Sequence, residues 1–182
     1  MIRPLANFSL NLSEVAQLVS AENSAAISQS SGSIQITGVA HRDSDVEPGD
    51  VFLAIPGAKV HGASFITAAV ARGAVAVVTD SAGAGFTSEL PTLIVKDVRT
   101  AGAIISSSLY KDPTRDLGAI GITGTNGKTT VSTLLYQIFQ GAGRDTGLIG
   151  TIETRIGSEA LTSTRTTPEA PELQALAAVM RE

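Results

Sequence analysis

Residues 121–130 read GITGTNGKTT and combine glycines, a lysine and hydroxyl side chains at a spacing suited to phosphate chemistry. Glycines let backbone N–H groups approach phosphate oxygens because no Cβ stands in the way. A lysine at the end of such a loop can reach the β- and γ-phosphates of a nucleotide, and the hydroxyl after it can bind Mg²⁺. The stretch departs from the Walker A spelling, since Ile122 stands where the first glycine belongs. An ordinary glycine-rich turn with a surface lysine is the alternative, and the full pattern favours phosphate binding.

The elements around this loop decide whether it can work as a phosphate cradle. A strand must fix the loop, and a helix must follow it, because the helix N-terminus adds about half a positive charge. The apolar residues 117–122 predict that strand, and residues 128–140 predict the helix. Lys128 is then the candidate catalytic residue and Thr129 the candidate Mg²⁺ ligand. Glu153 follows an apolar run and could serve as a second acid, although exposed strand-end glutamates are commoner.

The remaining sequence alternates between strand and helix patterns, which is typical of parallel βαβ units in an α/β fold. Upstream of the loop, strands are expected at 34–40, 51–55, 74–80 and 92–97 and helices at 12–19, 65–73 and 98–110, with Ser64 capping the second helix and a serine-rich loop at 20–33. Downstream, a strand is expected at 146–153 and a helix at 170–180.

Composition excludes several classes of protein. The net charge of −4 and the scattered distribution of 13 lysines and arginines argue against nucleic-acid binding, which needs clustered cations. The chain has no cysteine, which excludes disulfides and thiolate metal sites and fits a cytoplasmic protein. No apolar run approaches the roughly 20 residues that span a bilayer, so no membrane insertion is expected. His41 and His61, the two histidines, are expected in loops or on the surface and not as metal ligands.

A polar break at residues 111–116, KDPTRD, predicts a boundary between domains at 1–112 and 113–182. The second region offers too few strands for a doubly wound nucleotide domain, which normally has five or six. We therefore expect an incomplete domain, in a chain that is the front part of a larger protein and is inactive by itself.

Residues 123–130, TGTNGKTT, resemble the ATP loop of the Mur ligases, including its missing first glycine. Residues 46–80 resemble the N-terminal domain that holds the uridine end of the substrate in two branches of this family. Residues 164–174, TRTTPEAPELQ, resemble the branch that adds the third residue of the peptide. The resemblance implies an N-terminal α/β uridine-binding domain, followed by the beginning of a P-loop-type Mur ligase central ATPase domain.

The resemblance also implies a set of functional residues. The ATP-binding residues would be Gly124, Thr125, Asn126, Gly127, Lys128, Thr129 and Thr130. The UDP-muramoyl substrate would be contacted by Asp43 or Ser44, by Ala58, Lys59 and Val60, and by Thr166 and Thr167. The choice between Asp43 and Ser44 stays open, because the family often has Asp-Ser-Arg where this chain has Arg42, Asp43 and Ser44.

The implied reaction is an ATP- and Mg²⁺-dependent amide ligation in peptidoglycan synthesis, through an acyl-phosphate. Its substrates would be UDP-MurNAc-L-Ala-D-Glu and a diamino acid, either meso-diaminopimelate or L-lysine, and no protein partner is indicated. A dipeptide-adding ligase of the same family is the enzymatic alternative. A non-catalytic fragment that binds a nucleotide or a UDP-sugar is the non-enzymatic one.

Overall fold

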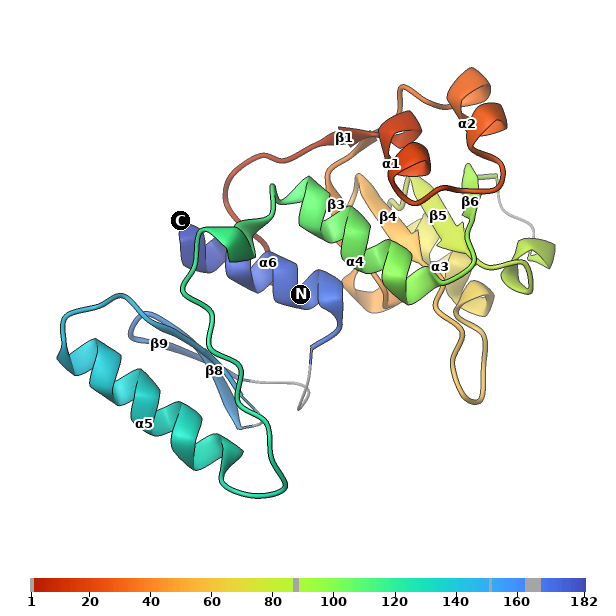
Figure 1. Cartoon of the computed structure of the whole chain (residues 1–182). Helices are drawn as coiled ribbons and strands as arrows, with labels where there is room; N and C mark the ends of the chain where they lie inside the picture. The colour runs from red at the N-terminus through yellow and green to blue at the C-terminus, as the bar shows by residue number, and fades with distance from the viewer. Residues whose placement is uncertain (1, 87–88, 151, 163–167) are drawn as a thin grey trace. The chain divides into compact units, whose positions relative to one another are not determined.

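The computed structural model describes residues 2–86, 89–150, 152–162 and 168–182 (Figure 1). The chain divides into two compact units, Leu5–Asp112 and Pro113–Glu182, and Ile2–Pro4 belong to the second. None of the helices in these described ranges is long and apolar enough to span a membrane.

The first unit is built on a four-stranded parallel sheet. Its strands follow chain order: β3 (Gly38–Ala40), β4 (Asp50–Leu53), β5 (Ala76–Thr79) and β6 (Thr92–Ile94). Every residue of β4 and β5 is buried, as expected for a parallel sheet covered on both faces. The predicted parallel βαβ arrangement and the α/β fold class are confirmed.

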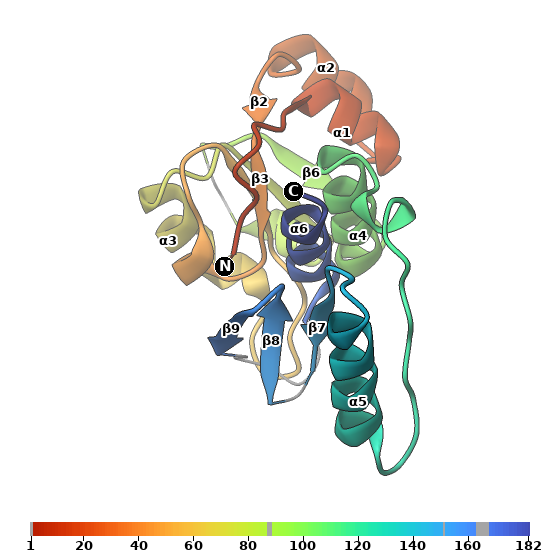
Figure 2. The same cartoon turned by 90° about the vertical axis from the view of Figure 1, so that its left-hand side faces the viewer.

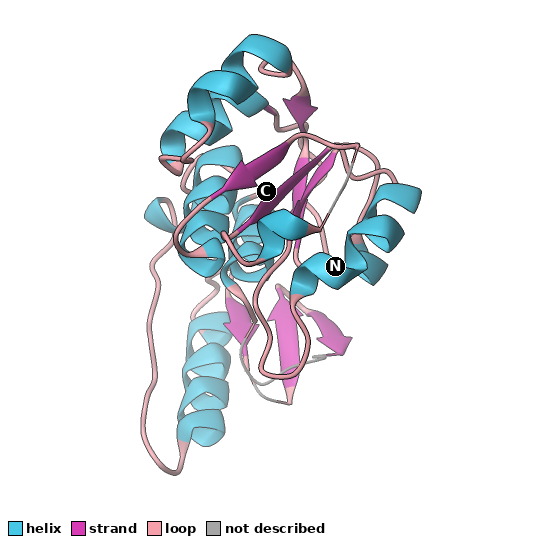
Figure 3. Cartoon of the chain, turned by 90° about the vertical axis from the view of Figure 1, so that its right-hand side faces the viewer, coloured by secondary structure: helices cyan, strands magenta, loops and turns pink. Residues whose placement is uncertain are grey.

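Helices cover both faces of this sheet (Figures 2 and 3). α3 (Ile66–Ala71) lies on one face and α4 (Val98–Leu109) on the other. Asp97 is the N-cap of α4, and its carboxylate accepts the N–H groups of Arg99 and Thr100. The core between the sheet and α3 consists of small and branched residues around one aromatic ring: Ala40, Val46, Phe52, Ala54, Ala63, Ile66, Ala69, Ala74 and Val77.

The predicted strand at 34–40 is two strands. β2 (Gln35–Ile36) pairs antiparallel with β1 (Leu10–Asn11), whereas β3 joins the parallel sheet. Thr37 lies between them and donates its N–H to Gly49 O at 2.9 Å, so the chain changes partners at this residue.

The serine-rich segment that was expected to be a loop contains α2 (Ser24–Ser30). This helix lies against α1 (Leu12–Leu18) and buries Ile27. Tertiary packing of one apolar side chain here outweighs the weak helix propensity of serine.

The described part of the second unit contains the 3-10 helix η4 (Pro113–Arg115), two α-helices and a three-stranded antiparallel sheet. α5 (Lys128–Gly141) precedes β7 (Gly147–Ile149), β8 (Glu153–Ile156) and β9 (Glu159–Thr162), and α6 (Ala170–Arg181) ends the chain. Both predicted helices are confirmed. The predicted strand at 146–153 is shorter than expected and is β7 alone, with β8 beginning at its last residue.

The strand predicted at 117–122 is wrong. This segment carries no strand pairing, and Ile120 is 57% exposed. A β-strand needs a neighbour for its backbone N–H and C=O groups, and no described segment provides one. The loop before α5 therefore follows a segment whose backbone is not paired in a sheet. The sequence had predicted a strand at this place, which would have held the loop in position.

We expect residues 1–112 to fold without the rest of the chain. The four-stranded sheet, its covering helices and its core all lie inside Leu5–Asp112. A chain ending at Asp112 should give a single cooperative transition in a thermal melt followed by circular dichroism. A gradual, non-cooperative melt would contradict this expectation.

Candidate functional site

The loop before α5 depends on two glycines with positive φ. Gly124 has a φ of +147° and Gly127, the N-cap of α5, has a φ of +79°. Residues with a side chain rarely adopt these values, so both positions favour glycine. The sequence prediction that glycines shape this turn therefore has a structural reason, even without the expected strand.

The N-terminus of α5 is open to solvent. Gly127 provides no side-chain cap, and the first helical hydrogen bond is donated by Val131 N to Gly127 O at 2.9 Å. The N–H groups at the start of the 14-residue helix thus point away from the helix without intrahelical partners. Residues 123–130 are all exposed. Such an end can receive an anion directly.

Lys128 folds back over the loop that it follows. Its Nζ donates to Gly124 O at 2.6 Å and lies 3.5 Å from Thr125 O. A cation held by loop carbonyls at the mouth of an open helix N-terminus is placed to meet a phosphate oxygen. A bound phosphate would replace these bonds between an ammonium and neutral carbonyls with a bond in which both partners are charged.

Thr129 fits the role of a metal ligand by its exposure. Its backbone carbonyl accepts the Ser132 hydroxyl at 2.9 Å, whereas its own hydroxyl makes no hydrogen bond to any described residue. Glu153 does not fit as a free second acid. Its Oε1 accepts from Arg155 Nε at 2.9 Å, and this bond holds the pKa of the Glu153 carboxyl below its ordinary value.

The first unit presents the other candidate residues at one edge of its sheet. Asp43 and Ser44 lie in a short 3-10 helix (Asp43–Asp45) that follows β3, and residues 58–60 lie in the loop that follows β4. Because β3 and β4 are parallel neighbours, both segments leave the sheet at its carboxyl edge. Ligands of open α/β sheets bind at this edge.

These candidate side chains are available to a ligand. Ser44, Ala58, Lys59 and Val60 are exposed and Asp43 is half-buried. Within the described residues, none of their side chains makes a hydrogen bond or an ion pair. Thr166 and Thr167, the remaining candidates, lie outside the described residues.

The Pro-Gly-Asp sequence before β4 has a structural role. Gly49 has a φ of +93°, and a Cβ there would lie 2.2 Å from Thr37 Oγ1. Asp50 is buried, and its Oδ2 accepts the Glu47 N–H at 2.9 Å, which closes the turn. These residues therefore start the strand that carries the loop at 58–60.

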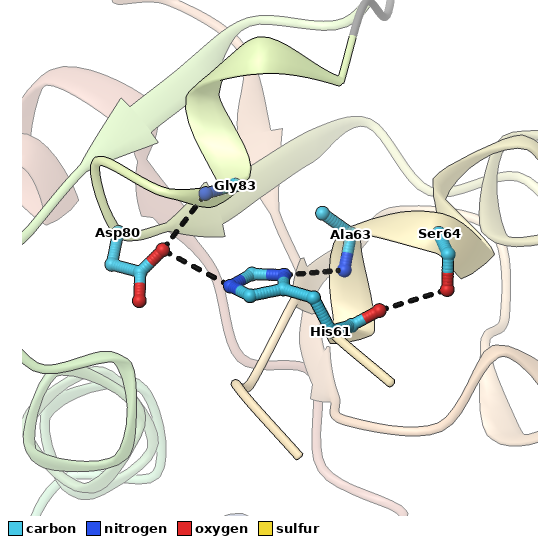
Figure 4. A network of polar contacts seen from close by, with 5 residues as sticks. All are labelled: His61, Ala63, Ser64, Asp80 and Gly83. Atoms are coloured by element: carbon cyan, nitrogen blue, oxygen red, sulfur yellow. Dashed lines mark hydrogen bonds and ion pairs between the residues drawn. The ribbon is translucent and has the colours of Figure 1, made fainter. Parts of the chain in front are cut away.

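Sequence reasoning missed a polar network beside this loop (Figure 4). His61 Nε2 lies 3.0 Å from Asp80 Oδ1, and His61 Nδ1 accepts the Ala63 N–H at 3.0 Å. His61 thus caps the 3-10 helix Gly62–Phe65, and α3 starts only at Ile66, so the predicted cap at Ser64 is wrong. Ser64 instead donates its hydroxyl to His61 O at 2.8 Å.

Folding lowers the pKa of the Asp80 carboxyl. Burial alone would raise this pKa, but the Gly83 N–H and the contact with His61 together outweigh it. A carboxylate with a lowered pKa adds stability above its unfolded pKa of about 3.9, and this contribution is lost as the pH falls further. No spacing in the sequence signals the pair, because 19 residues separate His61 from Asp80.

Known protein families match the segments that contain both candidate regions. Residues 35–121 match the description "Mur ligase family, catalytic domain", and residues 122–182 match "Mur ligase middle domain". The chain belongs to the Mur ligase family. The resemblance that the sequence motifs indicated is confirmed over nearly all of the chain after Ile34.

Individual relatives agree with this membership. The chain is 52% identical over 153 residues to UDP-N-acetylmuramoyl-L-alanyl-D-glutamate--2,6-diaminopimelate ligase of Streptomyces coelicolor, covering 83% of this chain and 30% of that protein. This Mur ligase chain thus spans about a third of the length of the curated relatives it matches.

Two solved structures share its fold. A MurF from Acinetobacter baumannii superposes with a TM-score of 0.58 at 22% identity, over 82% of this chain and 30% of that one. A UDP-N-acetylmuramoyl-L-alanyl-D-glutamate--2,6-diaminopimelate ligase also gives 0.58, at 24% identity, over 80% and 30% of the two chains. The fold is therefore common to both branches and does not separate them.

Proposed function

We propose that this chain forms the substrate-binding and nucleotide-binding front part of a ligase that joins 2,6-diaminopimelate to UDP-MurNAc-L-Ala-D-Glu. The observation that carries the proposal is the 52% identity to a ligase of that name, which extends over 83% of the chain. From the sequence alone, L-lysine was an equal choice of diamino acid, and the name of the relative favours diaminopimelate.

The reaction is an amide ligation driven by ATP. A carboxylate oxygen of the D-Glu residue attacks the γ-phosphorus, the bond to ADP breaks, and an acyl-phosphate forms. The amine of the diamino acid then attacks the acyl carbon, and inorganic phosphate leaves as the amide bond forms. The protein's contribution is to align the reactants and to offset the negative charge of the phosphates.

The loop before α5 supplies the nucleotide contacts in this proposal. The backbone N–H groups of residues 124–127 and the open N-terminus of α5 hold the β-phosphate. Lys128 leaves its carbonyl contacts and offsets charge on the transferring phosphoryl group. The Thr129 hydroxyl would bind Mg²⁺, and that ion would supply further charge neutralisation.

The carboxyl edge of the parallel sheet supplies the uridine contacts. Asp43 or Ser44 and the backbone of residues 58–60 offer hydrogen-bonding groups, and Lys59 offers an exposed cation suited to a diphosphate. Thr166 and Thr167 are proposed to contact the muramoyl part, on the sequence resemblance alone. The dipeptide-adding reaction is the second candidate, and it has only the shared fold in its favour.

Binding of UDP tests the uridine site. We expect UDP to shift the amide NMR signals of Asp43, Ser44 and residues 58–60 in the 182-residue chain, because their polar groups are exposed at one sheet edge. Uridine and inorganic phosphate, added separately, show which half of UDP each signal senses. Shifts confined to residues 117–130 would contradict the site.

A further inference from the structure

The His61–Asp80 pair lies outside the residues proposed to touch ligand, yet it connects the two loops at the carboxyl edge of the sheet. Asp80 directly follows β5, and His61 ends the loop that follows β4. Asp80 Oδ1 also accepts the Gly83 N–H at 2.9 Å, so the carboxylate is anchored in its own turn before it meets the histidine (Figure 4).

The hydrogen bonds fix the orientation of the imidazole ring. Because the Ala63 N–H donates to Nδ1, that nitrogen carries no proton, and the ring proton is on Nε2. Nε2–H therefore donates to Asp80 Oδ1. The ring also stacks on Phe86, with centroids 6.2 Å apart and planes inclined by 17°. One side chain thus ties together the 3-10 helix, the turn after β5 and the end of the β4 loop.

The base of the β4 loop is tightly closed. Pro56 and His61 form an antiparallel bridge, and Gly62 donates its N–H to Ile55 O at 3.0 Å. A Cβ on Gly62 would lie 2.7 Å from backbone atoms of Ala54 and Ile55, so the two ends of the loop lie in contact.

The tip of the same loop has no support from side chains. Ala58, Lys59 and Val60 are exposed, and none of their side chains makes a hydrogen bond to any residue that the structure describes. The base of the loop therefore determines the position of these three residues, and the His61 side chain holds this base to Asp80.

We propose that His61 and Asp80 form a latch that holds residues 56–61 in the shape that binds the nucleoside diphosphate end of the substrate. This inference rests on the proposed function, in which residues 58–60 touch that ligand. His61 and Asp80 are positioning residues, since they act through the loop and do not touch the ligand themselves.

Three substitutions distinguish the effect of the His61–Asp80 hydrogen bond from the effects of the neighbouring contacts. His61→Asn keeps an acceptor that can cap the Ala63 N–H, because asparagine is a good cap, but it is too short to reach Asp80. Asp80→Ala removes the acceptor altogether. Asp80→Asn keeps an oxygen that can accept from both Gly83 and His61, so it restores the latch if hydrogen bonding is what matters.

Asn23→Ala serves as the control for general loss of stability. The Asn23 side chain bonds Thr92 O at 2.8 Å and Ile94 N at 3.2 Å, at the β6 edge of the sheet. The substitution removes two partly buried hydrogen bonds between neutral groups at β6, which is two strands away from β4 in the sheet order.

The test measures the Kd of UDP for the 182-residue chain by calorimetry, together with amide hydrogen exchange of residues 56–61. We expect His61→Asn and Asp80→Ala to weaken UDP binding about 10-fold and to speed exchange in the loop, as loss of a hydrogen bond to a charged group predicts. Asp80→Asn and Asn23→Ala should bind UDP within about 2-fold of the unsubstituted chain.

Two results would overturn the latch. An unchanged Kd in His61→Asn and Asp80→Ala would show that the loop does not need it. An equal loss of affinity in Asn23→Ala would show that the effect is general destabilisation. A failure of the unsubstituted chain to bind UDP is a different outcome, because it overturns the proposed uridine site and the latch's ligand together.

Discussion

Lys128→Ala is expected to lower the rate of ATP-dependent amide formation by about 100- to 1,000-fold in the gene product that contains this chain, as loss of one preorganised charge donor does in other enzymes. The lysine Nζ lies at the mouth of the open α5 N-terminus, 2.6 Å from Gly124 O, and no neighbouring cation in residues 121–130 could replace it. The rate is measured as phosphate release at saturating substrates.

Lys96→Ala is the matched control, because Lys96 is an exposed lysine outside the loop. It should leave phosphate release unchanged. Binding of the UDP-muramoyl substrate should be unaffected in both variants, since the lysine acts on ATP and not on the uridine end. If Lys128→Ala turned over at the unsubstituted rate, the proposed role of Lys128 and its loop in catalysis would be contradicted.

Phe52→Ala is expected to destabilise the first unit by about 3–5 kcal/mol, the range measured when a buried phenylalanine becomes alanine. Phe52 is 1% exposed and lies in β4, at the centre of the core between the sheet and α3. A loss of this size is a large share of the roughly 5–15 kcal/mol that stabilises an ordinary domain. Urea unfolding followed by circular dichroism measures it.

Phe65→Ala provides the comparison, because Phe65 is the same residue type but 46% exposed. Its effect should be about 1 kcal/mol or less. Equal losses in the two variants would contradict the assignment of Phe52 to the core.

The parallel sheet was predictable because each of its central strands has a recognisable pattern in the local sequence. Residues 51–55 and 74–78 are continuous apolar runs, and such runs are typical of strands buried on both faces. The segment 117–122 has the same local pattern and was predicted to be a strand, but no described segment pairs with it. A strand forms only where another segment pairs with it, and that segment can lie far away in the sequence. The local pattern of apolar residues does not show whether such a segment exists.

The glycine turn before α5 was predictable for the opposite reason. Gly124 and Gly127 have positive φ values and Gly127 is the N-cap of α5, so the local sequence is enough to indicate the turn and the start of the helix. The His61–Asp80 contact is different. It joins residues that follow two neighbouring strands, and its position depends on the length and path of the loop between β4 and η2 (Gly62–Phe65).

The most direct test of the proposed function is a ligation assay on the gene product that contains this chain, with UDP-MurNAc-L-Ala-D-Glu, ATP and Mg²⁺. 2,6-Diaminopimelate is supplied with this acceptor, D-alanyl-D-alanine is supplied in a separate reaction with the diaminopimelate-containing tripeptide acceptor that a dipeptide-adding ligase uses, and the products are identified by mass. The proposal predicts a UDP-MurNAc-tripeptide with diaminopimelate, with one phosphate released per amide bond formed. No tripeptide with diaminopimelate, or product with the dipeptide alone, would contradict it.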